Sequence, residues 1–526
     1  MNTGAPLALR GRVVTMAQDV IDDGIVYCAG GDIVAVTKFG QQPPAGFINV
    51  ERIDTRGTIY PGLIDLHNHL EFNALPLWVP EEISEDRRKW QASGRYKREV
   101  RAVMEVLRKH CAAAVIRYVE AKALVGGTTS AQGMKIKDRG YHRGAVRNFE
   151  RPGDERFPAV DGEIFDLDPD NEARIRRGLE AGRFFHHLAE GIPEKARPAY
   201  LRVRDANLIG PNYVGIHCLG LEDGDFGYLA RKAGSVVWSP TSNGILYGRT
   251  LSLRALVESG ARWGLGSDWS PSGPKNLLGE MKVARLAARH AGVSLSSKRI
   301  VEAVTIRAAE IVGWENRVGR IAPGFAADMV VVKNRSSDPY ENLIAATERE
   351  IALVIINGVP RYGEQALMRS CGVQLDQIEH SDVGGKPSSF YLQDADSLPQ
   401  INEISLGRAT WALHMVMSNL RNPPDLADVF KEWNSTETLV LEVEDFAAGH
   451  DGDGRPQTFG HLPFLSAADY PPPESVDLDR IATVDDPGFF DRLESISWAA
   501  EYLHGLRSFY FPEHPPGANG TRRKFV

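Results

Sequence analysis

Cysteine, net charge and long apolar runs are all scarce in this sequence of 526 residues. The four cysteines (Cys28, Cys111, Cys218 and Cys371) lie far apart and include no Cys-x-x-Cys pair. This pattern excludes a disulfide framework and fits a reducing compartment. No apolar run is long enough to cross a membrane, and the first residues lack the basic start and apolar stretch of a signal peptide. We therefore expect a cytoplasmic protein without a membrane partner.

The charge balance is similarly unremarkable. A net charge of −8 is mild for a chain of this length, which argues against nucleic acid as the main partner. Hydrophobic residues at 43% and charged residues at 25% are usual for a globular protein. The length leaves room for two or three domains and a large core.

Short apolar runs at both ends of the first 363 residues predict β-structure. Residues 24–29 and 32–37 flank Gly30-Gly31, and residues 351–356 and 359–362 flank Asn357-Gly358. Both dipeptides favour two-residue hairpin turns. We expect residues 1–60 and 319–363 to build one small β-sandwich domain around an inserted middle domain.

The middle of the chain, residues 61–318, alternates short apolar runs with charged, helical stretches. Residues 86–124 keep a helix-like apolar spacing. The later strand candidates recur every 22 to 30 residues, the period of a strand-helix unit, which predicts an α/β fold with a (β/α)8 barrel. The strand candidates are 124–130, 183–188, 213–217, 235–239 and 262–267.

The segment PGLIDLHNH, residues 61–69, ends in His67-Asn68-His69. Its apolar residues predict a short buried strand. Side chains two apart on a strand share a face, so His67 and His69 converge on one point, where two neutral imidazoles can hold a metal ion. Such a pair alone is weak evidence, because two histidines in a loop are more often ordinary surface residues.

Further polar groups close the later strand candidates, where (β/α)8 barrels carry their reactive groups. Singly, each has a plainer interpretation: a histidine can be a hydrogen-bonded structural residue, Asp268 a helix cap and Glu190 a solvated charge. Chance explains poorly why His-x-His, His-x-x-Glu, His and Asp each end an apparent strand of one domain. The segments are HHLAEG (186–191), GIHCLG (215–220), WSPTSN (238–243) and GSDWSPSG (266–273).

These motifs in this order resemble the amidohydrolase superfamily, in its branch of aminohydrolases and chlorohydrolases. The likeness extends over residues 7–363, because VGRIAPGFAADMVVV and VIINGVPRYG resemble the family's returning sandwich segments. It implies catalytic positions for Glu190, His217 and Asp268. His187 is preferred to His186, since only His187 has the family's His-x-x-Glu spacing to Glu190. The implied metal ligands are His67, His69, His187 and Asp268.

The implied chemistry is hydrolysis by a metal-activated hydroxide. Three imidazoles and a carboxylate hold a divalent ion with one position open to water, and the ion lowers the pKa of that water to ~7. Glu190 then acts as the proton shuttle, and His217 either polarises the group under attack or stabilises developing charge. We expect one ion, with zinc favoured over iron, manganese or cobalt. Lys135 and Lys137 come too late after residues 124–130 for the carboxylated lysine of two-metal members.

The substrate is less well defined by the sequence. Four aromatic residues lie in or beside the presumed strand-end loops: Trp78, Trp238, Tyr247 and Trp269. They either stack on a flat substrate ring or belong to the ordinary packing of the barrel mouth. Residues 139–150 place His142, Arg143 and Arg147 near the presumed mouth, which suits an anionic or carbonyl-bearing substrate.

We therefore expect a hydrolase acting on a non-peptide carbon–nitrogen bond of a small molecule: an amide, a cyclic amidine or a heterocyclic amine. The alternatives are a chlorohydrolase on a halogenated heteroaromatic ring, or a non-catalytic barrel whose metal is structural. We also expect a homo-oligomer. Residues 364–526 form a C-terminal extension of unknown role, in which the acidic run GHDGDG (449–454) favours a plain turn over a calcium loop.

Overall fold

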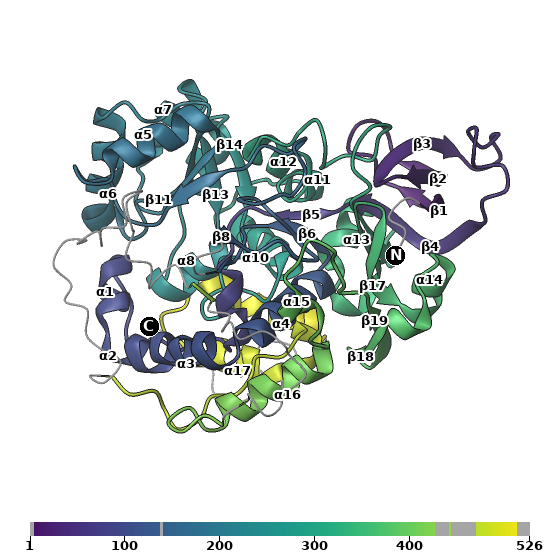
Figure 1. The fold of residues 1–526 in the computed structure, drawn as a ribbon. Helices are drawn as coiled ribbons and strands as arrows, with labels where there is room; N and C mark the ends of the chain where they lie inside the picture. The colour runs from purple at the N-terminus through teal and green to yellow at the C-terminus, as the bar shows by residue number, and fades with distance from the viewer. Residues whose placement is uncertain (1–4, 137–139, 425, 427–440, 443–469, 513–526) are drawn as a thin grey trace.

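One nine-stranded sheet joins strands from the beginning of the chain to strands beyond residue 328 (Figure 1). The computed structural model describes residues 5–136, 140–424, 426, 441–442 and 470–512. The strand order in this sheet is β18-β19-β17-β16-β15-β4-β1-β2-β3. The bounds are β1 Leu7–Val13, β2 Ile21–Ala29, β3 Asp32–Lys38, β4 Arg52–Pro61, β15 Met329–Lys333, β16 Ile351–Ile356, β17 Val359–Glu364, β18 Glu379–Val383 and β19 Lys386–Phe390.

Both predicted hairpins are confirmed. Ala29 pairs with Asp32 across two glycines that have positive φ. Ile356 pairs with Val359 across Asn357-Gly358, whose φ values are 51° and 71°. Two left-handed residues are what a type I′ turn requires.

Strand β4 connects the two halves of the sheet. It pairs in parallel with β1 and antiparallel with β15, where Pro61 lies opposite Met329. The sequence predicted a sandwich here, whereas the structure has one continuous sheet with a buried apolar cluster on each face. Strands β18 and β19 carry this sheet into the region assigned to the C-terminal extension. The domain boundaries themselves remain a prediction.

Eight parallel strands follow one another through residues 63–265 and form two sheets, β5-β6-β9 and β10-β11-β12-β13-β14. The sheets are hydrogen-bonded to each other at both junctions: Val160 N donates to Phe149 O (3.1 Å) between β9 and β10, and Leu66 N donates to Leu265 O (3.3 Å) between β5 and β14. The bounds are β5 Leu63–Asp65, β6 Thr128–Ala131, β9 Arg147–Asn148, β10 Asp161–Glu163, β11 Phe184–Leu188, β12 Tyr213–His217, β13 Ser235–Trp238 and β14 Arg262–Leu265.

Two predicted elements differ from the structure. The strand predicted from residue 124 begins only at Thr128, because Leu124 and Val125 complete a helix that Gly126 ends. The long helix predicted over residues 86–124 is broken at Ser93 and Cys111. Ser93 has extended backbone, and its side chain accepts a hydrogen bond from Tyr96 N, so it caps the next helical turn.

Helices surround the parallel strands, and further helices occur in the described C-terminal region. Within the described residues, none of the helices has the length and apolar character needed to span a membrane. The α-helices are α1 Arg87–Ala92, α2 Gly94–Tyr96, α3 Ala102–His110, α4 Ala112–Val125, α5 Glu172–Ala181, α6 Pro193–Asp205, α7 Asp223–Arg231, α8 Pro240–Tyr247, α9 Leu253–Glu258, α10 Leu277–His290, α11 Ser297–Glu302, α12 Ile306–Val312, α13 Pro339–Ala345, α14 Gln365–Ser370, α15 Pro399–Asn402, α16 Leu406–Met417, α17 Pro487–Ser495 and α18 Arg507–Tyr510. The remaining short strands are β7 Lys135–Ile136, β8 Gly140–Tyr141 and β20 Leu441–Glu442.

The C-terminal region packs on the parallel-strand unit. Helix α16 lies against α4, and the 3-10 turn η7 (Glu501–Gly505) lies against α10. In Figure 1 the yellow segment after residue 470 runs close to α4, α10 and α8.

Deletion of residues 1–55 is expected to give insoluble protein. The deletion removes β1, β2 and β3 and leaves the edge of β4 that pairs with β1 unpaired. An exposed strand edge promotes aggregation. Solubility and a thermal unfolding curve of the truncated chain check this, and a soluble truncation with cooperative unfolding would contradict it.

Candidate metal centre and active site

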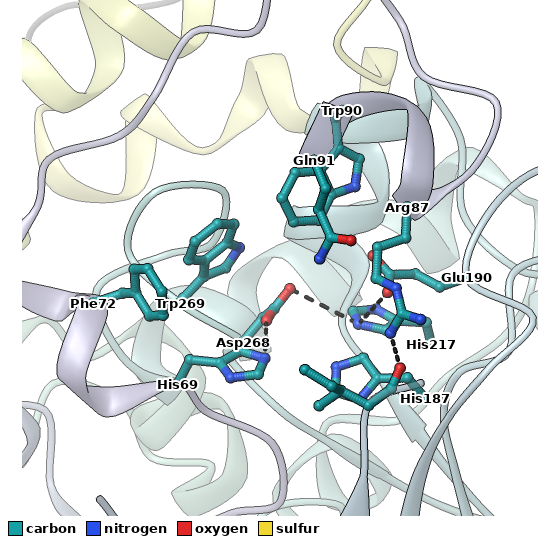
Figure 2. Close-up of a pocket in the computed structure, with 11 residues that line it drawn as sticks. His69, Phe72, Arg87, Trp90, Gln91, His187, Glu190, His217, Asp268 and Trp269 are labelled. Carbon is teal, nitrogen blue, oxygen red and sulfur yellow. Dashed lines mark hydrogen bonds and ion pairs between the residues drawn. The ribbon is translucent and has the colours of Figure 1, made fainter. Parts of the chain in front are cut away.

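Polar side chains from the carboxyl ends of four parallel strands converge on one centre, and all of them except His67 line the pocket there (Figure 2). Each lies within or just after its strand, so the backbone hydrogen bonds of the sheets fix its place. All are buried except His69, which is partly exposed. They are His67 and His69 after β5, His187 and Glu190 in and after β11, His217 at the end of β12 and Asp268 after β14.

The ligand atoms of this group lie at metal-site spacing. Three sets of three residues each offer nitrogen or carboxylate oxygen atoms within 4.8 Å of one another. Nε2 of His67 lies 3.2 Å from Oδ1 of Asp268, and Nε2 of His69 lies 3.7 Å from the same oxygen. The three sets are His67-His69-His187, His67-His217-Asp268 and His187-Glu190-His217.

Two imidazole nitrogens in this group are buried and make no hydrogen bond: Nε2 of His67 and Nδ1 of His187. A buried polar atom without a partner costs free energy. Nδ1 of His67 lies 2.6 Å from Oε1 of Gln132. An amide oxygen only accepts hydrogen bonds, so Nδ1 carries the proton and Nε2 is left with a free lone pair. These atoms fit a metal ion.

The structure separates His186 from His187. Neighbouring residues on a strand point to opposite faces, and His186 points away from the pocket. Its Nδ1 lies 2.8 Å from the Tyr213 hydroxyl and its Nε2 lies 2.8 Å from the Phe165 carbonyl oxygen. Burial, partly opposed by that carbonyl, lowers the pKa of His186 to about 4. His186 is therefore a neutral structural residue.

The protonation states also suit metal binding. Burial and the neighbouring histidines lower the pKa of His187 well below its ordinary value, so its imidazole is neutral. Burial also lowers the pKa of His217, although the charges of Glu190 and Asp268 partly oppose it. Burial raises the pKa of Asp268, but the electrostatic effect of the neighbouring histidines outweighs it and holds that pKa below the ordinary value. Neutral imidazoles beside a carboxylate are the usual donor set for a divalent metal.

Glu190 and His217 are each oriented by residues of α8. The Tyr247 hydroxyl donates to Oε1 of Glu190 (2.7 Å) and accepts from Nε1 of Trp90 (3.0 Å). Oε2 of Glu190 then faces Nε2 of His217 at 3.9 Å. Nδ1 of His217 lies 3.1 Å from Oδ1 of Asn243, which leaves Nε2 toward the pocket.

The backbone is strained where these strands end. Ala189, His217 and Asp268 have φ values of 50°, 66° and 65°. Residues other than glycine rarely adopt these left-handed values, and each such residue costs roughly 1–3 kcal/mol. The same turns direct Glu190, His217 and Asp268 toward one centre.

The pocket combines aromatic walls with a few polar groups. Trp269 lies 4.9 Å from Phe72 and 5.6 Å from Trp90, measured between ring centroids. Arg87 and Gln91, one turn apart on α1, line the same pocket (Figure 2). Small-molecule sites typically combine such walls with few polar groups.

The three basic residues expected at the mouth do not line this pocket. Nη2 of Arg147 donates to both carboxylate oxygens of Asp328 (2.8 and 2.7 Å) and so ties β9 to the nine-stranded sheet. Arg143 pairs with Asp396 at 2.6 Å, and buried His142 lies 3.8 Å from Glu120. Their predicted role in binding an anionic substrate is wrong, because each is held by an acidic partner elsewhere.

Of the four aromatic residues proposed to flank the mouth, only Trp269 lines the pocket directly. Tyr247 does not line the pocket, but its hydroxyl donates a hydrogen bond to Glu190, which does. Trp238 is buried and donates to the Thr250 hydroxyl (2.7 Å), and Trp78 packs 6.5 Å from Trp90. Lys135 is exposed on β7. Lys137 and residues 449–454 lie outside the described residues.

The sequence suggested Tyr247 only as a stacking or packing residue, and it did not indicate that three residues orient the groups of this site. Gln132, Asn243 and Tyr247 contact His67, His217 and Glu190 respectively. Asn243 belongs to SPTSN, a motif noticed for its position only. Gln132 directly follows β6, and this position at the end of a strand is the one feature of the sequence that could have indicated its role.

Gln132→Leu is expected to weaken divalent-metal affinity by roughly 10- to 100-fold, as is typical when a residue that orients a ligand is lost. Leucine cannot accept a hydrogen bond from the Nδ1–H group of His67, so the tautomer and ring orientation are no longer fixed. Zinc competition with a chromogenic chelator measures the affinity. Gln132→Glu keeps the acceptor and serves as the matched control. Equal affinities in the leucine variant and the wild type would contradict the role of Gln132.

Comparison with known proteins agrees with this geometry. The Amidohydrolase family matches residues 170–361. A 5-methylthioadenosine/S-adenosylhomocysteine deaminase from Syntrophobacter fumaroxidans is 25% identical over 404 residues, covering 67% of this chain and 91% of the relative. A 5′-deoxyadenosine deaminase from Methanosarcina barkeri is 24% identical, covering 66% and 90%.

Solved structures show the same fold. Atrazine chlorohydrolase from Arthrobacter aurescens TC1, solved with zinc, superimposes with a TM-score of 0.54 at 18% identity, covering 67% of this chain and 94% of its own. Escherichia coli guanine deaminase gives a TM-score of 0.52 at 17% identity, covering 69% and 100%.

The chain is similar to the aminohydrolase branch of the amidohydrolase superfamily, through the family match over residues 170–361 and the deaminase relatives. It is accordingly an enzyme of the amidohydrolase and deaminase type, a class that hydrolyses carbon–nitrogen bonds other than peptide bonds.

Proposed function

We propose that this protein is a metal-dependent deaminase that hydrolyses the exocyclic amine of a purine-like heteroaromatic ring. Water replaces the amino group: a carbon–oxygen bond forms, the carbon–nitrogen bond breaks, and ammonia leaves. The observation that carries the proposal is the convergence of His67, His69, His187 and Asp268 beside Glu190 and His217. A structural metal site needs the four ligands but has no use for the adjacent carboxylate and imidazole.

The arrangement of the eight parallel strands supports a closed (β/α)8 barrel as the scaffold. The hydrogen bonds from Val160 to Phe149 and from Leu66 to Leu265 join the two parallel sheets at both junctions. In such a barrel the carboxyl ends of all strands face one mouth. The site residues from β5, β11, β12 and β14 occupy those ends, which fits the proposed active site.

We assign the metal to His67, His69, His187 and Asp268, with zinc as the first candidate. The buried, unpartnered nitrogens of His67 and His187 support this assignment. A divalent ion in such a site supplies hydroxide at neutral pH and charge stabilisation for the reaction.

The remaining groups then have separate tasks. Glu190 holds one carboxylate oxygen on Tyr247 and presents the other to the pocket, where it accepts a proton from the attacking water and passes it to the leaving nitrogen. His217 presents Nε2 beside both Glu190 and Asp268, where, once it has taken up a proton, it stabilises the negative charge that develops on the ring during the attack.

The substrate class follows from the walls of the pocket. Phe72, Trp90 and Trp269 offer flat apolar surfaces for an aromatic ring. Arg87 and Gln91 offer hydrogen-bond donors for the polar edge of such a ring. Two of the relatives carry the names 5-methylthioadenosine/S-adenosylhomocysteine deaminase and 5′-deoxyadenosine deaminase, which favours an adenine-containing substrate.

Ammonia and chloride release from purified, zinc-loaded protein tests the proposal. The panel comprises adenosine, 5′-methylthioadenosine, adenine, guanine, cytosine and a chlorinated triazine. We expect ammonia from at least one purine compound and no chloride from the triazine. Chloride release alone would instead indicate the chlorohydrolase alternative. Tight metal binding without release of ammonia or chloride from any compound would overturn the deaminase assignment. It would instead favour the non-catalytic alternative.

A further inference from the structure

The described C-terminal segment makes hydrogen bonds to two segments near the active site. Near its beginning, Asp479 N donates to Ala74 O (2.9 Å) at the end of the 3-10 turn η1 (Leu70–Ala74), which follows the His67-Asn68-His69 loop. Near its end, residues 498–502 lie on α8. Residues 478–503 thus contact two segments that carry site residues.

Asp479 is buried and lies between two buried lysines. Nζ of Lys122 donates to Oδ2 of Asp479, and Nζ of Lys275 donates to Oδ1. Lys275 also pairs with Asp486 at 2.9 Å. The carboxylate therefore compensates two charges that come from α4 and from the loop after β14.

Lys122 extends this contact to the metal-site loops. Its Nζ donates to the Ser270 hydroxyl and to the Asn73 carbonyl oxygen, both at 2.7 Å. Ser270 lies two residues after Asp268, and its N–H donates to Oδ1 of Asn73 (2.8 Å). Nδ2 of Asn73 donates to Oδ1 of Asn68 (3.0 Å), the residue between the two metal-site histidines. A continuous set of hydrogen bonds joins Asp479 to both loops.

The second contact holds α8. Nε1 of Trp498 donates to Ile245 O (3.2 Å), Ala500 N donates to Gly244 O (3.0 Å), and the Tyr502 hydroxyl donates to Pro240 O (2.7 Å). All three acceptors are backbone carbonyls of the helix that carries Asn243, the partner of His217, and Tyr247, the partner of Glu190.

We propose that residues 478–503 are part of the active-site framework, in which Asp479 positions the loops bearing His67, His69 and Asp268, and Tyr502 positions α8. The inference rests on the proposed metal-dependent hydrolysis. Buried ionic groups cost desolvation free energy and are poor general stabilisers, but they fix geometry where every member has a partner. Here the onward contacts of Lys122 and the contact of Tyr502 end on segments that carry a site residue or its partner.

Two pairs of variants test this framework. Tyr502→Phe removes one hydroxyl, and Tyr27→Phe is its control, because the buried Tyr27 hydroxyl makes no hydrogen bond. We expect Tyr502→Phe to lower kcat by roughly 3- to 10-fold, the equivalent of one hydrogen bond, with unchanged zinc content and a smaller change in KM. We expect Tyr27→Phe to behave as wild type.

The second pair addresses Asp479 without leaving an unbalanced charge. Lys122→Met/Asp479→Asn removes one charge of each sign and leaves Lys275 with Asp486. Its control, Arg147→Met/Asp328→Asn, removes another buried ion pair that touches no site residue. We expect both double variants to lose stability, but only the first to lose zinc affinity, by roughly 10- to 100-fold, measured by chelator competition.

The outcomes separate the two proposals. Wild-type kcat in Tyr502→Phe together with wild-type zinc affinity in folded Lys122→Met/Asp479→Asn would overturn the framework. Zinc affinity lost equally in both double variants would also overturn it, because the effect would then reflect stability alone. A wild-type protein that binds zinc but releases no ammonia refutes the proposed reaction, while the affinity comparison still decides the role of Asp479.

Discussion

Glu190→Gln is expected to lower kcat by roughly 10²- to 10⁴-fold, the usual contribution of a general acid–base group. Glutamine has the shape of glutamate and keeps an oxygen that accepts the hydrogen bond from Tyr247. It cannot accept and pass on a proton. KM is expected to change less, because the pocket walls that hold the substrate are unaltered.

Zinc content is measured in the same samples, and it should equal that of the wild type. Glu194→Gln is the matched control, because Glu194 is an exposed carboxylate four residues further along the chain, and its activity should be unaltered. A carboxylate ligand such as Asp268 can also serve as the base. In that case Glu190→Gln would stay within roughly tenfold of wild type, less than a principal shuttle contributes.

His187→Ala and Asp268→Ala are each expected to remove most of the metal and with it most of the activity. Purified wild-type protein should hold about one divalent ion per chain, as in a mononuclear hydrolytic site. Each substitution removes one of the four proposed ligands. Elemental analysis after dialysis against metal-free buffer gives the metal content.

His186→Ala provides the control on the same strand. It removes an equally buried imidazole that points away from the pocket toward Tyr213 and Phe165. We expect lower thermal stability and unchanged metal content, because a buried hydrogen-bonded side chain is lost while the donor set is intact. Full metal retention in both His187→Ala and Asp268→Ala would refute the assigned ligands.

Local patterns in the sequence anticipated the part of the site that strands determine. Alternation along residues 61–69 placed His67 and His69 on one face, and the ends of later strands supplied His187, His217 and Asp268. The structure brings all of these side chains together with Glu190. A parallel strand exposes its carboxyl end at a fixed edge of the sheet, so a short motif is enough to locate such residues.

Local sequence patterns could not predict contacts between segments that are far apart in the chain. Lys122 lies in an alanine-rich helix, and nothing nearby indicates that its partner is Asp479, 357 residues later. The basic residues 142–147 looked like part of a mouth, yet Arg147 pairs with Asp328 and Arg143 with Asp396. The position of α1, which brings Arg87, Trp90 and Gln91 over the pocket, depends on tertiary packing that periodicity does not encode.

The position of β4 within the nine-stranded sheet has a consequence for biosynthesis. Its partner β15 begins at Met329, 268 residues after β4 ends at Pro61. At a synthesis rate of roughly 5–20 residues per second, one edge of β4 waits ~13 to 54 s for its partner to emerge from the ribosome. An apolar strand with an open edge pairs readily with other chains. Slower elongation lengthens this wait, and a high expression level raises the concentration of waiting chains, so both should increase aggregation of the nascent chain. Chaperones that bind residues 1–61 during translation should reduce it.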